Sequence, residues 1–250
     1  MNRQAQAVVL LLLGGAVLRA SVTDLYLRYV KEGLRPFLIA AGLLLVVAAI
    51  MTLWYELRPA LTDDPAAVPA DEPDTGHGGH GGHGHHEPRV GWLLILPVLG
   101  LLLVAPPALG SYAASQAGTA LSTPARSDYP PLPAGDPVSV SVLDYAARAL
   151  FDRGTSIGDR RVRLTGFITT GPDRQPMLAR MVLSCCAADG RPVKLGLSGD
   201  VPTGLPDDSW VEVVGRYSER LGRDPVNDAE IPYLDVESWR QVPVPKRQYD

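Results

Sequence analysis

The sequence PFLIAAGLLLVVAAIMTLWY fills residues Pro36 to Tyr55 and contains no charged side chain. An α-helix rises 1.5 Å per residue, so about 20 apolar residues suffice to cross the hydrocarbon core of a bilayer. Trp54 and Tyr55 stand at the end of the run, where membrane helices carry interfacial aromatic anchors. We therefore predict a transmembrane helix over Pro36–Tyr55.

Two further apolar segments flank this helix. GWLLILPVLGLLLVAPPAL, from Gly91 to Leu109, is also uncharged, and Pro97 is compatible with a kinked span because membrane helices tolerate proline. Ala5 to Leu18 is shorter and follows Arg3, a pattern that also describes a signal peptide. No soluble domain separates it from the next apolar segment, which favours a short membrane helix. Residues 1–109 thus form a predicted α-helical membrane region of two to three spans.

This pattern predicts a multi-pass integral protein of the plasma membrane. The alternative is a buried helical hairpin in a soluble protein, but a soluble domain of this size rarely needs two long uncharged stretches. The first loop carries four Lys or Arg residues against two in the second, whereas Arg3 and the amino terminus add positive charge on the opposite side. The charge count therefore does not fix the side of the membrane on which the C-terminal part lies.

All the histidines of the chain lie in the loop TGHGGHGGHGHH, residues 75–86. They are His77, His80, His83, His85 and His86. Imidazole binds zinc and other transition metals, and the glycines between the rings leave the backbone free to fold around an ion. The spacing is irregular, so the tract predicts weak metal capture. The alternative is a solvated Gly/His linker between two spans.

A tether and a short helix follow the membrane region. Residues 110–137 are rich in Ser, Ala, Pro and Gly without a sustained period, which predicts a linker. In VSVLDYAARALFDRG the apolar residues recur at helical spacing, with Ser141 as the expected N-cap and Gly154 as the C-cap. We expect one face of this helix to pack on the domain beyond it.

Five strand-like runs separated by Gly, Pro and Asp turns fill the rest of the C-terminal region. The runs are Arg161–Ile168, Met177–Cys186, Pro192–Gly199, Trp210–Tyr217 and Tyr233–Val242. Such a set predicts a small all-β domain over residues 138–250, a partly open barrel of the oligonucleotide/oligosaccharide-binding (OB) type. A two-layer β-sandwich is the alternative.

Composition excludes several functions. The net charge is −4 and the strands lack the clustered basic and aromatic side chains of a single-strand groove, so no nucleic acid is expected as a partner. The soluble part has no histidine, no G-x-S-x-G elbow and no Walker loop, so we do not expect an enzyme.

The adjacent thiols of Cys185 and Cys186 are the chemically active candidates in the soluble part. On a strand, neighbouring side chains point to opposite faces, which places them poorly for sharing one ion. Each is then either a small core side chain or a thiol that contacts a soft metal or takes part in redox chemistry.

The C-terminal sequence LARMVLSCCAADGRPVKLGLSG, followed by DDSWVEVVGRY and IPYLDVESWRQVPVPKRQY, resembles the YcgQ-type family of uncharacterised bacterial membrane proteins. The segments LYLRYVKEGLRPFLIAAGLLLVV and LILPVLGLLLVAPPALGSYAASQAG are similar to the N-terminal half of that family. The resemblance is most specific at residues 184–192. It implies a partner subunit of a predicted multi-span permease, with a soluble barrel of the nucleic-acid-binding type for which no nucleic-acid binding is known.

These observations together predict an accessory subunit of a membrane permease complex that serves the transport or homeostasis of a transition metal, zinc or another. The spans contain no intramembrane charge to mark a conduction path, so the chain is not expected to form the pore alone. The alternative is a membrane-anchored metal or redox sensor that acts without a permease.

Overall fold

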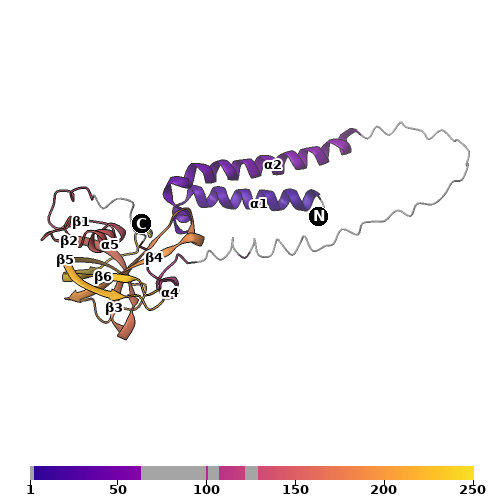
Figure 1. The fold of residues 1–250 in the computed structure, drawn as a ribbon. Coiled ribbons are helices and arrows are strands. Elements are labelled where there is room, and N and C mark those ends of the chain that lie inside the picture. The colour runs from indigo at the N-terminus through magenta and orange to yellow at the C-terminus, as the bar shows by residue number, and fades with distance from the viewer. Residues whose placement is uncertain (1–2, 63–99, 101–106, 122–128) are drawn as a thin grey trace, which may run out of the picture. The chain divides into compact units, whose positions relative to one another are not determined.

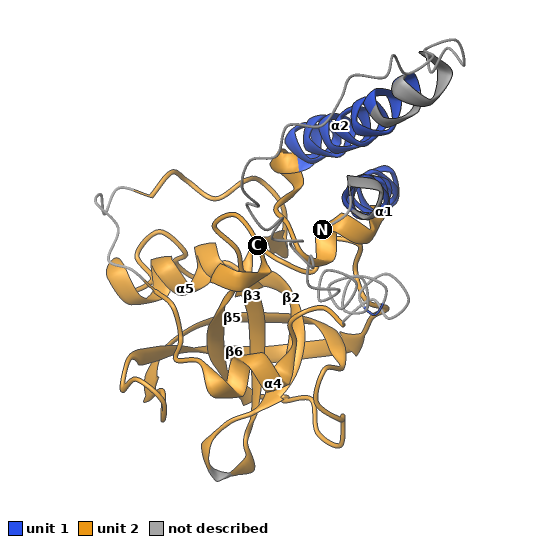
Figure 2. Cartoon of the chain, turned by 90° about the vertical axis from the view of Figure 1, so that its right-hand side faces the viewer, with its two compact units in different colours: residues 1–23, 35–106 blue, residues 24–34, 107–250 orange. Residues whose placement is uncertain are grey.

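The structure, a computed structural model, describes residues 3–62, 100, 107–121 and 129–250 (Figure 1). It divides into two compact units (Figure 2). The first comprises residues 1–23 and 35–106, and the second comprises residues 24–34 and 107–250. The loop that joins the first two helices therefore belongs to the same unit as the C-terminal domain.

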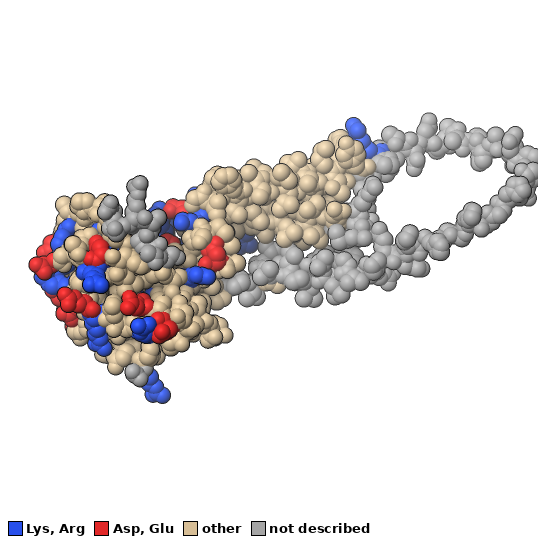
Figure 3. Space-filling model, viewed as in Figure 1, with Lys and Arg blue, Asp and Glu red and all other residues tan. Residues whose placement is uncertain are grey.

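Within its described residues, the first unit contains two helices packed side by side, α1 (Arg3–Val22) and α2 (Arg35–Thr62). Glycines allow the two helices to approach closely. A side chain at Gly14 would place its Cβ only 3.0 Å from the Gly42 carbonyl oxygen, which is too close for an ordinary contact. Most outward side chains are apolar, and Figure 3 shows a surface without charged residues between the two ends of the described helices. This exposed apolar surface distinguishes the pair from a core hairpin of a soluble protein.

The helix over Glu32–Tyr55 is the one helix within the described residues that is long and apolar enough to cross a membrane. Only 11% of its apolar window is buried, whereas a soluble core helix is mostly buried. The prediction for Pro36–Tyr55 is thus confirmed as a membrane-capable helix, although length and composition also suit a signal sequence. The apolar part of α1, Gln6–Val22, is shorter. Residues 91–99 and 101–106 of the third predicted segment lie outside the described residues.

The C-terminal unit is built on a five-stranded mixed β-barrel. Its strands are β2 (Val162–Thr170), β3 (Pro176–Val182), β4 (Arg191–Gly199), β5 (Trp210–Arg223) and β6 (Glu230–Gln241). They follow the order β2-β3-β4-β6-β5, and pairing of β2 with β5 closes the barrel. The β4–β6 pair is parallel and the other four are antiparallel. This closure rules out the alternative β-sandwich. A two-residue strand, β1 (Val138–Ser139), pairs with β2 in parallel.

The predicted short helix is α5 (Val142–Phe151), and it contacts every strand of the barrel. Ser141 caps it as predicted, because its hydroxyl accepts a hydrogen bond from the Asp144 N–H. The chain leaves the helix at Asp152, two residues before the predicted Gly154. The fully buried Tyr145 donates its hydroxyl to the Tyr233 carbonyl oxygen at 2.6 Å. The helix thus packs into the main core with the inward side chains of the strands.

The described part of the predicted tether is a folded strap on the barrel, which corrects that prediction. Residues 107–121 contain a helix, α4 (Ser111–Gln116), that contacts β2, β3 and β4. Beyond it, the Thr119 N–H donates to the Asp224 carboxylate at 2.8 Å. Asp224 also pairs with Lys194 at 2.9 Å, with both side chains buried. Long-range contacts therefore fix this segment, which local sequence cannot reveal.

The last residues of the chain form a second strap along β3. The Asp250 N–H donates to the Met181 carbonyl oxygen, and the Asp250 carboxylate pairs with the Arg180 guanidinium at 3.1 Å. Burial raises the pKa of Asp250 and lowers the pKa of Arg180, and each charge opposes the shift of the other. Residues 242–250 thereby reach the region where loop 24–34 lies.

Candidate metal centre

The candidate site is the connection between β3 and β4. β3 ends at Val182, opposite Arg191, and the chain between them contains Ser184, Cys185, Cys186 and Asp189. The predicted strand Met177–Cys186 is thus four residues too long. One Asp189 carboxylate oxygen accepts the N–H of Ser184 at 2.8 Å. The other accepts the N–H of Cys185 at 2.8 Å and of Cys186 at 3.3 Å.

These hydrogen bonds bring the two thiols to the same place. Cys185, Cys186 and Asp189 each offer one ligand atom, and these atoms lie within 4.8 Å of one another. The expectation of thiols on opposite faces is therefore wrong, because it assumed a strand and the residues lie in a turn. Cys185 is exposed and Cys186 is half-buried, so neither is an inert core side chain. An ion from solution can reach both thiols.

The donor set fits a thiophilic divalent ion. Zinc binds thiolates at about 2.3 Å and carboxylates at about 2.0–2.2 Å, which places two thiolate ligands roughly 3.8 Å apart in a tetrahedron. The ligand atoms lie within 4.8 Å of one another, so they need to approach by about 1 Å at most. Rotation of the side chains can provide a movement of this size. Three protein ligands leave the fourth position for water or another ligand.

The electrostatics of the cluster disfavour a free thiolate. Hydrogen bonding to the Asp189 carboxylate, and then to Cys186, raises the pKa of Cys185 to about 11. The same thiol, followed by the backbone N–H groups, lowers the pKa of Asp189 to about 2. At neutral pH the cluster therefore holds a carboxylate beside a protonated Cys185 thiol, which is a poor nucleophile. A bound cation would compensate the carboxylate and displace the thiol proton.

We expect Asp189→Asn to make Cys185 more reactive. The substitution removes the negative charge that keeps the thiol protonated, so the pKa of Cys185 falls from about 11 towards its ordinary value. The thiolate fraction at pH 8 then rises by roughly tenfold to 100-fold. Reaction with a disulfide reagent across pH, in a Cys186→Ser background with and without Asp189→Asn, measures the shift. Equal rates in the two proteins would show that the carboxylate does not control the thiol.

The loop between α1 and α2 packs directly against this turn. Val30 and Cys186 form an isolated antiparallel bridge. The Lys31 N–H donates to the Cys185 carbonyl oxygen at 3.1 Å, and the Ala187 N–H donates to the Tyr29 carbonyl oxygen at 2.7 Å. Two short 3-10 helices, Asp24–Arg28 and Glu32–Leu34, flank the pairing residues of the loop.

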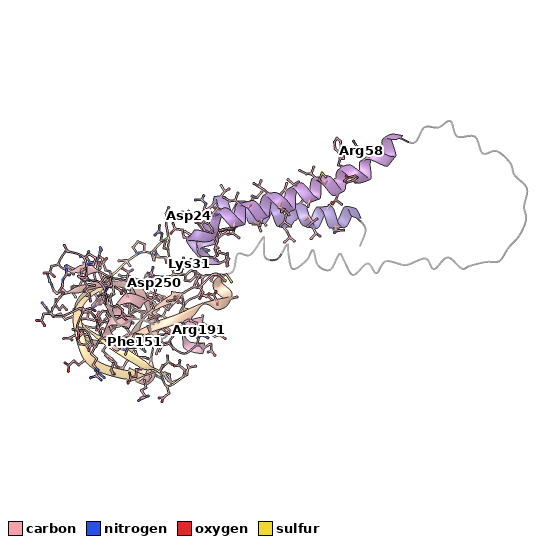
Figure 4. All side chains as sticks on the ribbon, turned by 45° about the horizontal axis from the view of Figure 1, so that its top comes forward. Asp24, Lys31, Arg58, Phe151, Arg191 and Asp250 are labelled. Atoms are coloured by element: carbon pink, nitrogen blue, oxygen red, sulfur yellow. The ribbon has the colours of Figure 1, made fainter. Side chains whose placement is uncertain are left out.

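A cavity of about 640 Å³ opens beside the turn. Asp189 and Ser184 line it together with side chains from α5, including Phe151, and with Arg191 at the start of β4. Figure 4 labels Phe151 and Arg191 on these elements. A smaller cavity of about 220 Å³ lies between loop 24–34 and the C-terminal strap, with Lys31 and Asp250 in its lining (Figure 4). Solvent and small ligands therefore have room beside the cluster.

The structure brings Cys185 and Cys186 together but does not test the histidines. The tract His77–His86 lies outside the described residues, so its metal capture stays a prediction. Sequence reasoning missed Asp189. The signal was available, because a carboxylate three residues after Cys186 can reach back to the preceding backbone N–H groups, as in an N-terminal helix cap.

The fold and site define a class of protein: a membrane-capable helix, paired with a shorter apolar helix, joined to a small β-barrel domain that carries a Cys–Cys–Asp cluster. Residues 149–249 match the family model of the DUF1980 C-terminal domain, an uncharacterised family. The match covers β2 to β6 and the whole cluster. No curated protein and no solved structure matches the chain. The expectation of an uncharacterised family is thus confirmed for residues 149–249, whereas the resemblance of the N-terminal half stays a prediction.

Proposed function

We propose that the chain is an accessory subunit of a membrane permease complex and that it binds a thiophilic transition metal at Cys185, Cys186 and Asp189. The observation that carries the proposal is the convergence of two thiols and a carboxylate on one accessible turn, beside the loop of an apolar helical pair. We infer a binding role rather than a catalytic one. Zinc is the leading ion because its ligand preferences match the donor set.

The exposed apolar helices support the membrane part of the proposal. α2 has the length and composition of a span, and only 11% of the apolar window of Glu32–Tyr55 is buried. We infer a multi-pass protein of the plasma membrane, with Gly91–Leu109 as a further span. A transport path needs polar or charged groups within the membrane, and residues 36–55 have no charge. A separate multi-span protein is therefore the expected partner.

The strand order supports an OB-like barrel, with the first strand beside the fourth and the third parallel to the fifth. Such barrels commonly bind ligands across the face of their second and third strands. In this chain those strands are β3 and β4, and residues 107–121 pack on them. This strap supports the expectation that nucleic acid is not the ligand.

We expect the purified full chain to bind one zinc ion tightly. Replacing both Cys185 and Cys186 with Ser removes two ligands, so the affinity falls by about 100-fold or more. Deletion of residues 75–86 leaves this tight site intact and removes only weak additional binding. Calorimetric titration with zinc alone, with metal content measured after desalting, checks both variants. Tight binding that survives the double Cys→Ser substitution would refute the assignment.

Cross-linking in intact membranes tests whether the chain has a permease partner. The tagged chain, cross-linked before extraction, is expected to recover a multi-span protein in fixed stoichiometry. Replacing α1 and α2 with an unrelated pair of spans keeps the β-domain anchored, and we expect it to abolish this recovery. Recovery of the wild-type chain without a multi-span protein would contradict the accessory role.

A metal sensor that acts without a permease is the second candidate. The specific observation in its favour is the pairing of Lys31 with Cys185, which places the cluster in contact with the loop between the helices. The raised pKa of Cys185 disfavours the redox version of this candidate, because the thiolate is the reactive form. Zinc binding with no recoverable partner is the result expected for a sensor.

A further inference from the structure

Two of the three residues that offer metal ligands, Cys185 and Cys186, also hold loop 24–34. The Cys185 carbonyl oxygen and the Ala187 N–H, on either side of Cys186, both bond to the loop. The side chain of Cys186 belongs to the cluster while its backbone forms the bridge with Val30. The positions of the two thiol ligands and the docking of the loop therefore depend on the same backbone segment, residues 185–187.

The loop also has a buried side chain, Tyr26, and several polar contacts with the C-terminal strap. The Tyr249 hydroxyl donates to the Arg28 carbonyl oxygen at 2.8 Å and accepts the Leu109 N–H at 3.0 Å. Two ion pairs, Lys246–Asp24 and Arg247–Glu32, are largely exposed and therefore weak. Because these ion pairs contribute little, a ligand that favours the docked loop can shift the balance between its docked and released forms.

We propose that metal binding at Cys185, Cys186 and Asp189 and docking of loop 24–34 on the β-domain stabilise each other. This proposal rests on the metal site of the proposed function and specifies its regulation. With the loop docked, the backbone of Cys185 and Ala187 is fixed and the three ligand atoms already lie within 4.8 Å. With the loop released, that backbone loses two hydrogen bonds, and an ion has to order the ligands itself.

The coupling is reciprocal by thermodynamic necessity. If docking raises metal affinity by a given factor, the metal raises the docking equilibrium by the same factor. Coupling between sites is typically 5-fold to 150-fold, and here we expect about tenfold. Because α1 ends at Val22 and α2 begins at Arg35, the docked loop joins both helices directly. Metal occupancy thereby acts on the segment from which both helices extend.

Hydrogen exchange of the full chain in detergent, with and without zinc, tests the proposal. The reporters are the backbone N–H groups of Lys31 and Ala187, which bond across the docked pair. Zinc is expected to slow their exchange about tenfold. Tyr249→Phe removes the hydroxyl that holds the loop without touching a ligand, and should weaken zinc binding severalfold. Tyr112→Phe, at a tyrosine that is 80% exposed, is the matched control and should change nothing.

The outcomes separate the coupling from the site. One bound zinc per chain with unchanged exchange at Lys31 and Ala187 overturns the coupling and leaves the metal site standing. Equal zinc affinity of Tyr249→Phe and Tyr112→Phe also overturns it. Failure of the wild-type chain to bind zinc, measured by metal content, overturns the site and with it the coupling.

Discussion

Asp224→Ala is expected to lower the free energy of unfolding of the β-domain by about 3–5 kcal/mol, because it leaves a buried ammonium group without its partner. The Lys194 and Asp224 side chains are 6% and 0% exposed and lie 2.9 Å apart. The Asp224 carboxylate also accepts the Thr119 N–H, and the Lys194 ammonium donates to the Ala117 carbonyl oxygen. Removing the carboxylate therefore also loosens residues 117–119.

Denaturant unfolding of the full chain, followed by near-ultraviolet circular dichroism, measures this loss. Replacing both partners together, Lys194→Met with Asp224→Leu, removes the unpaired charge and should recover much of the stability. Arg223→Gln is the matched control, since the Arg223–Asp228 pair is exposed and should contribute less than about 1 kcal/mol. Equal losses for Asp224→Ala and Arg223→Gln would contradict the interpretation of a buried pair.

Leu195→Ala is expected to cost about 2–5 kcal/mol of stability, the range measured when a buried leucine is truncated. Leu195 is fully buried on β4 and packs in the main core with residues from α5 and the other strands. The surrounding strands are hydrogen-bonded around the closed barrel, so they relax little into the space left behind.

The control for this substitution lies on another strand of the barrel. Leu221 on β5 is 48% exposed, and Leu221→Ala should cost less than about 1 kcal/mol. The same unfolding measurement compares the two variants. If Leu195→Ala were as mild as Leu221→Ala, the barrel interior would not be the main stabilising core.

The sequence predicts the elements whose signals are local. The uncharged run Pro36–Tyr55 indicates a membrane-capable helix by composition alone, and α5 begins at the predicted cap, Ser141. Alternation of apolar residues predicts all five barrel strands, with the largest error at the end of β5, which runs six residues beyond Tyr217 to Arg223. The parallel β4–β6 pair and the closure of the barrel depend on residues far apart in the sequence. Local patterns therefore do not distinguish a barrel from a sandwich, whereas the β2–β5 pairing does.

The strap and the candidate site show two different reasons for error. The strap is held by Thr119 and Asp224, which are 105 residues apart, so composition suggested a linker. At the site, S-C-C-A-A is compatible with continued strand, and the Asp189 carboxylate ends the strand by taking three backbone N–H groups. A side chain that accepts hydrogen bonds from backbone N–H groups competes with strand pairing. The alternation of apolar and polar residues carries no information about such a competitor.

The docking of loop 24–34 on the β-domain also constrains how the chain can thread a bilayer. Two segments in contact lie on the same side of a membrane, so an α2 that spans must be followed by an odd number of further crossings before residue 107. Gly91–Leu109 has the apolar length for one such crossing. A chain in which α2 made the last crossing would place loop 24–34 and residues 107–250 on opposite sides, which the Lys31–Cys185 and Ala187–Tyr29 backbone bonds exclude.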